Sequence, residues 1–301
     1  MRLAYHRLDV FADRPLVGHP LAVLADADGL SAAQMQAIAR EFNLSATAFV
    51  LTPRDSLHAA RLRIFTPARD LSFAGHATIG AAALIALLRA PDMIARQPLG
   101  LVLEQEIGPV ACEVWRHGGA IRARFTAPRQ PEILEILQDR EKIAAALGLA
   151  APDLGFDAHA PSIASAGPAF AFVPVAGLSE LNRVAPKGET FGDAFGPERP
   201  GVFIYTRETD DPAHHVQARA FIPGLGVGED PANGSAACAF AAVACAFERP
   251  EEGEHEIVIE QGFAMGRPGL IGLTLQVACG QLTQTRVGGA CVKVGEGALT
   301  I

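Results

Sequence analysis

A long pattern that occurs twice constrains the fold of this chain more than any other feature. Residues 63–88 read RIFTPARDLSFAGHATIGAAALIALL, and residues 219–247 read RAFIPGLGVGEDPANGSAACAFAAVACAF. Each copy runs from an arginine through a short apolar stretch, a proline and a polar loop to a glycine and an alanine-rich segment. The matched residues are Arg63, Phe65, Pro67, Gly75 and His76 in the first copy, and Arg219, Phe221, Pro223, Gly234 and Ser235 in the second.

The repeat predicts two similar halves, each of which directs the N-terminus of a helix at a shared cleft. The expected helices are His76–Arg89, which ends before Pro91, and Ser235–Phe247. The first turn of a helix presents unpaired N–H groups and the positive end of the helix dipole, so it attracts negative charge. The sequence therefore predicts a cleft that holds a small anionic molecule.

The overall composition is that of a compact globular enzyme. A chain of 301 residues is long enough for two domains. Its net charge of −8 argues against nucleic acid or an anionic membrane as a partner. No apolar run approaches the ~18–20 residues of a membrane span, and the first residues do not resemble a signal peptide. We therefore expect a cytoplasmic protein.

The five cysteines have no CxxC spacing, which favours reduced, buried thiols over disulfides. No His, Cys or Asp cluster has the spacing of metal ligands, so we expect no metal. The glycines form neither GxGxxG nor a Walker loop, and no nucleotide cofactor is expected.

The periodicity predicts an antiparallel-rich α+β chain in two domains. Ser31 and Gln34 form a capping box at the start of an amphipathic helix. The proline-rich segment Thr126–Glu132 is the predicted linker, which gives domains at residues 1–127 and 128–288. The end of the chain, residues 289–301, is a candidate strand of the first domain. Two separate strands are expected near the C-terminus, at Gln284–Val287 and Ala290–Val294.

Asp230 and His76 are the leading candidates for chemistry. Asp230 lies in GEDPANGS, and a desolvated cleft would raise the pKa of this carboxyl toward the range useful for moving a proton at carbon. A turn position before Pro231 would explain the same residue without chemistry. His76 opens the first helix, where it can bind a carboxylate, relay a proton or simply end the helix with a polar group.

Ser235 and His19 are weaker candidates. Ser235 is expected to be the N-cap of the second helix, which leaves neighbouring N–H groups for a ligand. A hydrolase built on Ser235 and His76 is disfavoured, because NGSAA lacks the GxSxG turn. His19, in VGHP, reads either as a turn residue or as a substrate contact.

Five blocks of the sequence carry a family resemblance that covers nearly the whole chain. They are DVFADRPLVGHPLAV, LSAAQMQAIAREFNLSATAFV, RIFTPARDLSFAGHATIGAA, GEDPANGSAA and EQGFAMGRP. Together they resemble the PhzF-like family of phenazine biosynthesis, within the diaminopimelate epimerase superfamily. The resemblance implies two similar α+β domains, each a mixed, largely antiparallel sheet wrapped around a central helix, with the active-site cleft between them. It also implies a homodimer and an isomerase that moves a proton between two carbons of a small cyclic substrate without a cofactor.

The resemblance also implies the site residues. They are His76, Asp230 and Ser235, with Gly75 and Gly234 where the backbone comes close to the substrate. The family's proton-transferring glutamate, in a motif of the NLSET type, falls on position 46, which is Ala46 here. Alanine cannot transfer a proton, and the loss of such a group costs about 10²–10⁴-fold in rate.

Three explanations of Ala46 stay open at this level. The chain is an isomerase that uses Asp230 with His76 or another group, a binding protein that kept the cleft, or a form in which residue 46 was changed deliberately. His19 replaces the asparagine of the family's GGNP and is a candidate to supply part of the missing proton capacity. Cys238 is a weaker candidate, because related epimerases use thiols in the cleft. The favoured hypothesis is an isomerase acting on a small ring or amino-acid-like carboxylate, and the alternative is a non-catalytic binder of such molecules.

Overall fold

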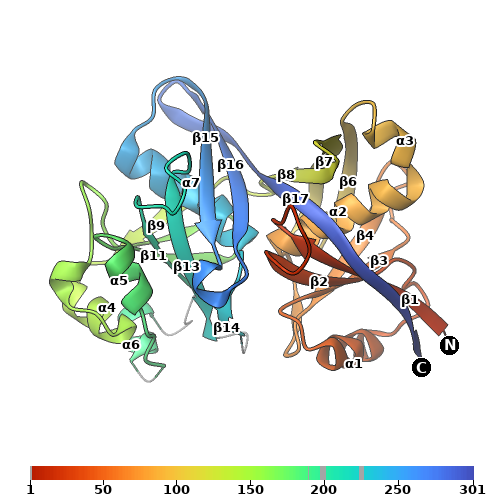
Figure 1. The fold of residues 1–301 in the computed structure, drawn as a ribbon, viewed down its shortest axis with the longest axis horizontal. Helices are drawn as coiled ribbons and strands as arrows, with labels where there is room; N and C mark the ends of the chain where they lie inside the picture. Colours follow the sequence, from red (N-terminus) through yellow and green to blue (C-terminus); the bar gives the residue numbers. More distant parts are fainter. Residues whose placement is uncertain (1, 189, 197–200, 224–226) are drawn as a thin grey trace. The chain divides into compact units, whose positions relative to one another are not determined.

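The computed structural model describes residues 2–188, 190–196, 201–223 and 227–301, and the chain divides into two units (Figure 1). The first unit is Met1–Pro128 together with Arg286–Ile301, and the second is Arg129–Thr285. In both units, a mixed sheet packs around one helix. Among the described helices, none is long and apolar enough to cross a lipid bilayer.

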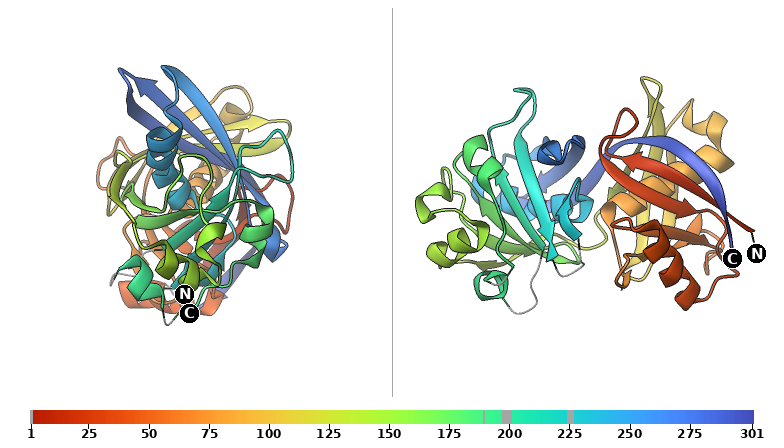
Figure 2. Two further views of the ribbon diagram at one scale, coloured as in Figure 1. Left: turned by 90° about the vertical axis from the view of Figure 1, so that its left-hand side faces the viewer. Right: turned by 60° about the horizontal axis from the view of Figure 1, so that its bottom comes forward.

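Eight strands of the first unit form a closed ring of hydrogen-bonded neighbours. In spatial order they are β17 (Gln281–Thr300), β1 (Arg2–Val10), β2 (His19–Leu24), β3 (Thr47–Leu51), β4 (Ala60–Phe65), β6 (Leu99–Gln105), β7 (Gly108–His117) and β8 (Ala120–Thr126), which returns to β17. The β2–β3 and β4–β6 pairs are parallel and the others antiparallel. The two ends of the chain lie side by side, because Arg2 is opposite Thr300 in the β1–β17 ladder (Figure 2).

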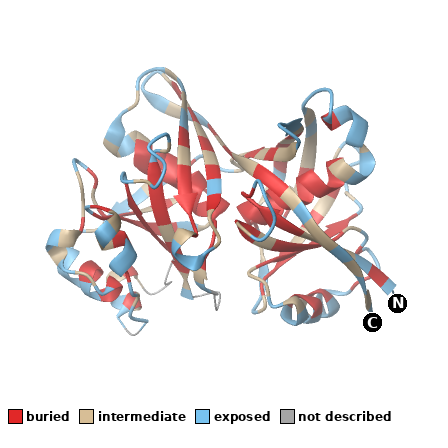
Figure 3. Cartoon of the chain, viewed as in Figure 1, coloured by how far each residue is buried: buried red, intermediate tan, exposed pale blue. Residues whose placement is uncertain are grey.

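Helix α2 (Gly75–Arg89) contacts seven of these strands: β1, β2, β3, β4, β6, β7 and β8. Every residue from Gly75 to Ala86 is buried (Figure 3). A helix that is apolar on all sides is stable only when it is surrounded, and the ring provides that environment. Helix α1 (Ala32–Phe42) packs on β3 and β4, and its predicted capping box between Ser31 and Gln34 is confirmed. The short helix α3 (Pro91–Ile94) follows α2.

The second unit has the same plan. Its strands, in spatial order, are β9 (Glu132–Ile136), β10 (Ser162–Ser165), β11 (Ala169–Pro174), β12 (Gly201–Thr206), β13 (Val216–Ile222), β15 (Gly253–Gln261) and β16 (Gly269–Ala278). Helix α7 (Gly234–Glu248) contacts β9, β10, β11 and β16 and is buried from Gly234 to Ala244. Three shorter helices belong to this unit, namely α4 (Arg140–Leu147), α5 (Leu178–Arg183) and α6 (Phe191–Phe195).

The sequence repeat is a structural duplication. The series β10–β11–β12–β13–β15–β16 repeats the pairing directions of β1–β2–β3–β4–β6–β7, namely antiparallel, parallel, antiparallel, parallel and antiparallel. A short hairpin strand, β5 (Asp70–Leu71) or β14 (Val227–Asp230), precedes each central helix. An ion pair spans each hairpin, Arg63 with Asp70 at 2.9 Å and Arg219 with Glu229 at 2.8 Å.

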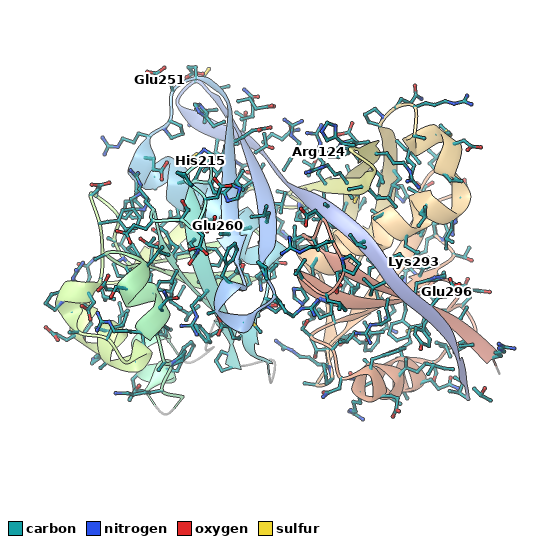
Figure 4. The ribbon with its side chains drawn as sticks, in the orientation of Figure 1. Arg124, His215, Glu251, Glu260, Lys293 and Glu296 are labelled. Carbon is teal, nitrogen blue, oxygen red and sulfur yellow. The ribbon has the colours of Figure 1, made fainter. Side chains whose placement is uncertain are left out.

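A carboxylate at the end of the strand after each central helix extends the duplication. Glu104 on β6 accepts two backbone N–H groups, from residues 54 and 55, and bonds His58 at 3.0 Å. The backbone donors, the N–H of Asp55 first, lower the pKa of Glu104 to about 2. Glu260 on β15, labelled in Figure 4, likewise accepts two backbone N–H groups. It also bonds His214, at 2.7 Å. Burial alone would raise the pKa of Glu260, but these hydrogen bonds lower it.

Two expectations are wrong. The predicted strands Gln284–Val287 and Ala290–Val294 are parts of the single strand β17. The glycines between them do not turn the chain, since Gly288 lies where β8 approaches closely. A Cβ at Gly288 would be 2.6 Å from Arg124 Cβ. The five cysteines are free, but Cys279 is exposed rather than buried.

Candidate functional site

The predicted site residues form two groups, one in each unit. The first group is His19, Ala46, Gly75 and His76, and the second is Asp230, Gly234 and Ser235. Gly75 and Gly234 are the first residues of α2 and α7. Each group is therefore built around the N-terminal turn of the central helix of its unit.

Two histidines stack on each other in the first unit. The ring centroids of His19 and His76 are 3.5 Å apart, and the ring planes differ by 9°. His19 is the first residue of β2, and His76 is the second residue of α2. Their exposed fractions are 0% and 7%, so the stacked pair is almost fully removed from solvent.

Ser45 makes a hydrogen bond to His19, the fully buried member of this pair. A hydrogen bond joins Nε2 of His19 to Oγ of Ser45, which lies just before β3. The parallel pairing of β2 with β3 brings these two segments together. Ala46, the next residue, is fully buried and offers only a methyl group. Ala46, where the resemblance implies the family's glutamate, therefore directly follows Ser45, the hydrogen-bond partner of His19.

His76 is in a setting that favours its neutral form. Burial, and secondarily the charge of His19, lowers the pKa of His76 well below its ordinary value of 6.5. The positive end of the α2 dipole acts in the same direction. The Nε2 atom of His76 is buried and has no hydrogen-bond partner within the described part of the chain. At neutral pH, His76 is therefore an uncharged imidazole.

The stability of the protein is expected to fall as the pH drops below about 6.5, because His76 must stay neutral in the native state but protonates when unfolded. The native state binds fewer protons between the lowered pKa of His76 and 6.5, so stability rises with pH across that window. The slope contributed by one such group is at most about 1.4 kcal/mol per pH unit. Urea unfolding of the wild type and His76→Gln at several pH values would measure it. Identical pH dependence of the two proteins would contradict this assignment.

Helix α7 is capped by Asn233, and the expectation that Ser235 is the cap is wrong. Asn233 has an extended backbone, and its side-chain oxygen accepts the N–H of Ala236 at 2.8 Å. Ser235 is the second residue of the helix and is buried. Asparagine satisfies an N-cap as well as serine does, so residue preference alone could not choose between them. Helix α2 differs, because Ala74 at its start makes no side-chain cap.

Asp230 is part of a buried hydrogen-bond network at the start of α7. Its Oδ2 atom accepts Nδ2 of Asn233 at 2.7 Å. Gln261, at the end of β15, donates Nε2 to the backbone oxygen of Asp230 at 2.6 Å and accepts the N–H of Asn233 at 3.0 Å. Only 3% of Asp230 is exposed. The network fixes the carboxylate where the loop enters the helix.

The segment after Gln261 packs against the same loop. Gly262 has φ +81°, and a Cβ there would lie 2.4 Å from the carbonyl oxygen of Arg267 and 2.5 Å from that of Pro231. Only glycine tolerates both the backbone conformation and this approach. The EQG segment thus supports the loop that carries Asp230.

The variant Asn233→Ala is expected to lower the free energy of unfolding by about 1–3 kcal/mol, because it removes the cap of α7 and a hydrogen bond to Asp230. Urea denaturation would measure the loss. Ser31→Ala, which removes the cap of the more exposed helix α1, is the matched control and should leave turnover unchanged. Wild-type stability and turnover in Asn233→Ala would contradict the role given to this network.

Three residues of these groups were missed from the sequence: Ser45, Asn233 and Gln261. The blocks NLSAT, GEDPANGS and EQGFAMGRP contain all of them, so polar residues beside the matched motif positions were the available signal. Cys238 is fully buried one turn into α7, and burial raises its pKa to about 12. A thiol with that pKa is a poor nucleophile or base at neutral pH. The described residues contain no cluster of three or more His, Cys, Asp or Glu side chains suited to a metal ion.

A duplicated α+β fold, in which the sheet of each half packs around one central helix, is of the diaminopimelate-epimerase-like type. Comparisons with known proteins identify the family. The model of the phenazine biosynthesis-like (PhzC–PhzF) family matches residues 8–297. The chain belongs to this family and is an isomerase of the PhzF type.

Individual relatives match this chain over nearly their full length. An uncharacterized isomerase of Mesorhizobium japonicum is 42% identical over 99% of this chain and 98% of its own. The trans-2,3-dihydro-3-hydroxyanthranilate isomerase of Pseudomonas chlororaphis is 35% identical over 99% of each chain. The crystal structure of a PhzF-family protein from Bacillus anthracis superposes with a TM-score of 0.89, at 25% identity and 100% coverage of both chains.

Proposed function

We propose that this chain moves a proton between two carbons of a small cyclic carboxylate, without a cofactor. One observation carries the proposal: a buried acid/base group accompanies the start of each central helix, His76 on α2 and Asp230 before α7. Helix N-termini bind the carboxylate of such a substrate, and the adjacent group reaches the carbon beside it.

In the proposed mechanism, the neutral imidazole of His76 takes the proton. The C–H bond breaks, its electron pair enters the conjugated system of the substrate, and His76 becomes an imidazolium. Asp230, the buried carboxylate before α7, is the second acid/base group of the proposed mechanism. The proton then returns to a second carbon, so the step consumes neither electrons nor protons. Gly75, Gly234 and Ser235 belong to the helix starts that receive the carboxylate.

The relatives support the proposed substrate class. The P. chlororaphis relative is named for trans-2,3-dihydro-3-hydroxyanthranilate, a ring that bears a carboxylate and carbon-bound protons. Coverage of 99% of both chains supports a related substrate here. Ala46 distinguishes this chain from the pattern of the resembling family and favours a different base. We therefore assign the proton transfer to His76 with Asp230.

The experiment is to incubate the protein with trans-2,3-dihydro-3-hydroxyanthranilate and follow the isomers by NMR, with calorimetry on the same samples. Conversion that scales with protein concentration is expected. Binding without conversion would contradict the proposal and indicate a carboxylate-binding protein that kept the site and lost the reaction.

A further inference from the structure

His76 needs support that α2 alone does not provide. A general base must stay neutral and keep a fixed orientation, because small misplacements of a catalytic group are costly in rate. Its Nε2 has no hydrogen-bond partner within the described residues. The face of its ring, in contrast, is covered by His19.

We propose that His19 is a positioning residue for the reaction: held by Ser45, it stacks on His76 and keeps that imidazole oriented and neutral, so that His76 can act where Ala46 cannot. The inference rests on the proposed function and extends it to a residue for which the family resemblance implies asparagine instead. Both rings are buried, so neither is an ordinary solvent-exposed polar side chain.

The close stacking of His19 and His76 also has an electrostatic effect. Two positively charged rings with centroids 3.5 Å apart would repel each other strongly in a buried setting, which favours the neutral form of His76. After burial itself, the electrostatic effect of His19 lowers the pKa of His76. On the neighbouring strand β1, the carboxylate of Asp9 is buried and accepts the N–H of Leu16 at 2.6 Å.

Ser45 restricts the movement of the His19 ring. The Ser45 hydroxyl anchors one edge of the His19 ring from the segment before β3, while the backbone of His19 is fixed in the β1–β2 ladder opposite Val10. The ring of His19 therefore has little freedom to tilt. A flat, anchored ring on the face of His76 limits the rotation of that imidazole as well.

The test combines an NMR titration of the histidine rings with kinetics on trans-2,3-dihydro-3-hydroxyanthranilate. His19→Asn should raise the pKa of His76 and lower kcat on the order of 10²-fold, with a smaller change in KM. His19→Phe keeps the stacked ring without its charge, so it should raise the pKa of His76 and retain more of kcat than His19→Asn. Ser45→Ala should lower kcat as well, and His117→Asn, at an exposed position on β7, is the control.

The proposal is overturned if the titration of His76 and the value of kcat are the same in His19→Asn as in the wild type. It is also overturned if His19→Phe and His19→Asn lose kcat equally with no change in the titration of His76, since that result indicates a packing role. The titration needs no substrate. It therefore decides the coupling of the two rings even if this compound is not turned over, and so separates this inference from the proposed function.

Discussion

The variant Asp230→Asn is expected to lower kcat by about 10²–10⁴-fold while leaving the fold intact. Asparagine has nearly the same shape as aspartate, and its side-chain oxygen can still accept the hydrogen bond from Nδ2 of Asn233, which is 2.7 Å long in the wild type. The bond from Gln261 goes to the backbone oxygen of residue 230 and is unaffected by the change. The substitution thus removes the negative charge and leaves the network in place.

The measurement is the rate of isomer conversion by NMR, together with the urea midpoint of the same preparation. Asp26→Asn, at an exposed position, is the matched control and should behave as the wild type. Wild-type kcat in Asp230→Asn would remove this residue from the mechanism. A large loss of stability in Asp230→Asn would mean that its charge supports the loop before α7 rather than the reaction.

His76→Gln should lower kcat by a similar factor, about 10²–10⁴-fold, because glutamine can hydrogen-bond but cannot accept a proton from carbon. The lowered pKa of His76 makes a further prediction about the wild type. Its activity should be maintained as the pH falls below 6.5, until His76 itself becomes protonated.

The check is a pH profile of kcat for the wild type beside single-pH assays of His76→Gln. His117→Gln, an exposed histidine on β7, serves as the control. If His76→Gln keeps wild-type turnover, the base is another group, and the stacked pair has a structural role only.

The duplicated architecture could be predicted from the sequence because its signals are local. The Arg-to-Gly pattern, the alanine-rich segments and the capping box at Ser31 each depend on neighbouring residues, and α2 and α7 begin within one residue of the predicted starts. A further sign of the repeat is present in the sequence. His58 and Glu104 are separated by the same 46 positions as His214 and Glu260.

The interactions that shape the candidate site could not be predicted in this way. His19 and His76 are far apart in the sequence, and only the closure of the sheet around α2 stacks their rings. The choice of Asn233 over Ser235 as the cap depends on where the loop from β14 enters α7, which residue preferences do not determine. The adjacent glycines at 288 and 289 suggested a break, but the missing side chain of Gly288 instead admits β8.

The most direct test of proton transfer by this chain is solvent proton exchange at carbon, measured on the unmodified protein. The protein would be incubated in D₂O with trans-2,3-dihydro-3-hydroxyanthranilate, beside Ala46→Glu, and carbon-bound deuterium followed by NMR. We expect the unmodified chain to incorporate deuterium, because His76 and Asp230 move the proton without a carboxylate at position 46. Incorporation by Ala46→Glu alone would contradict this expectation and show that the site is intact but lacks its base.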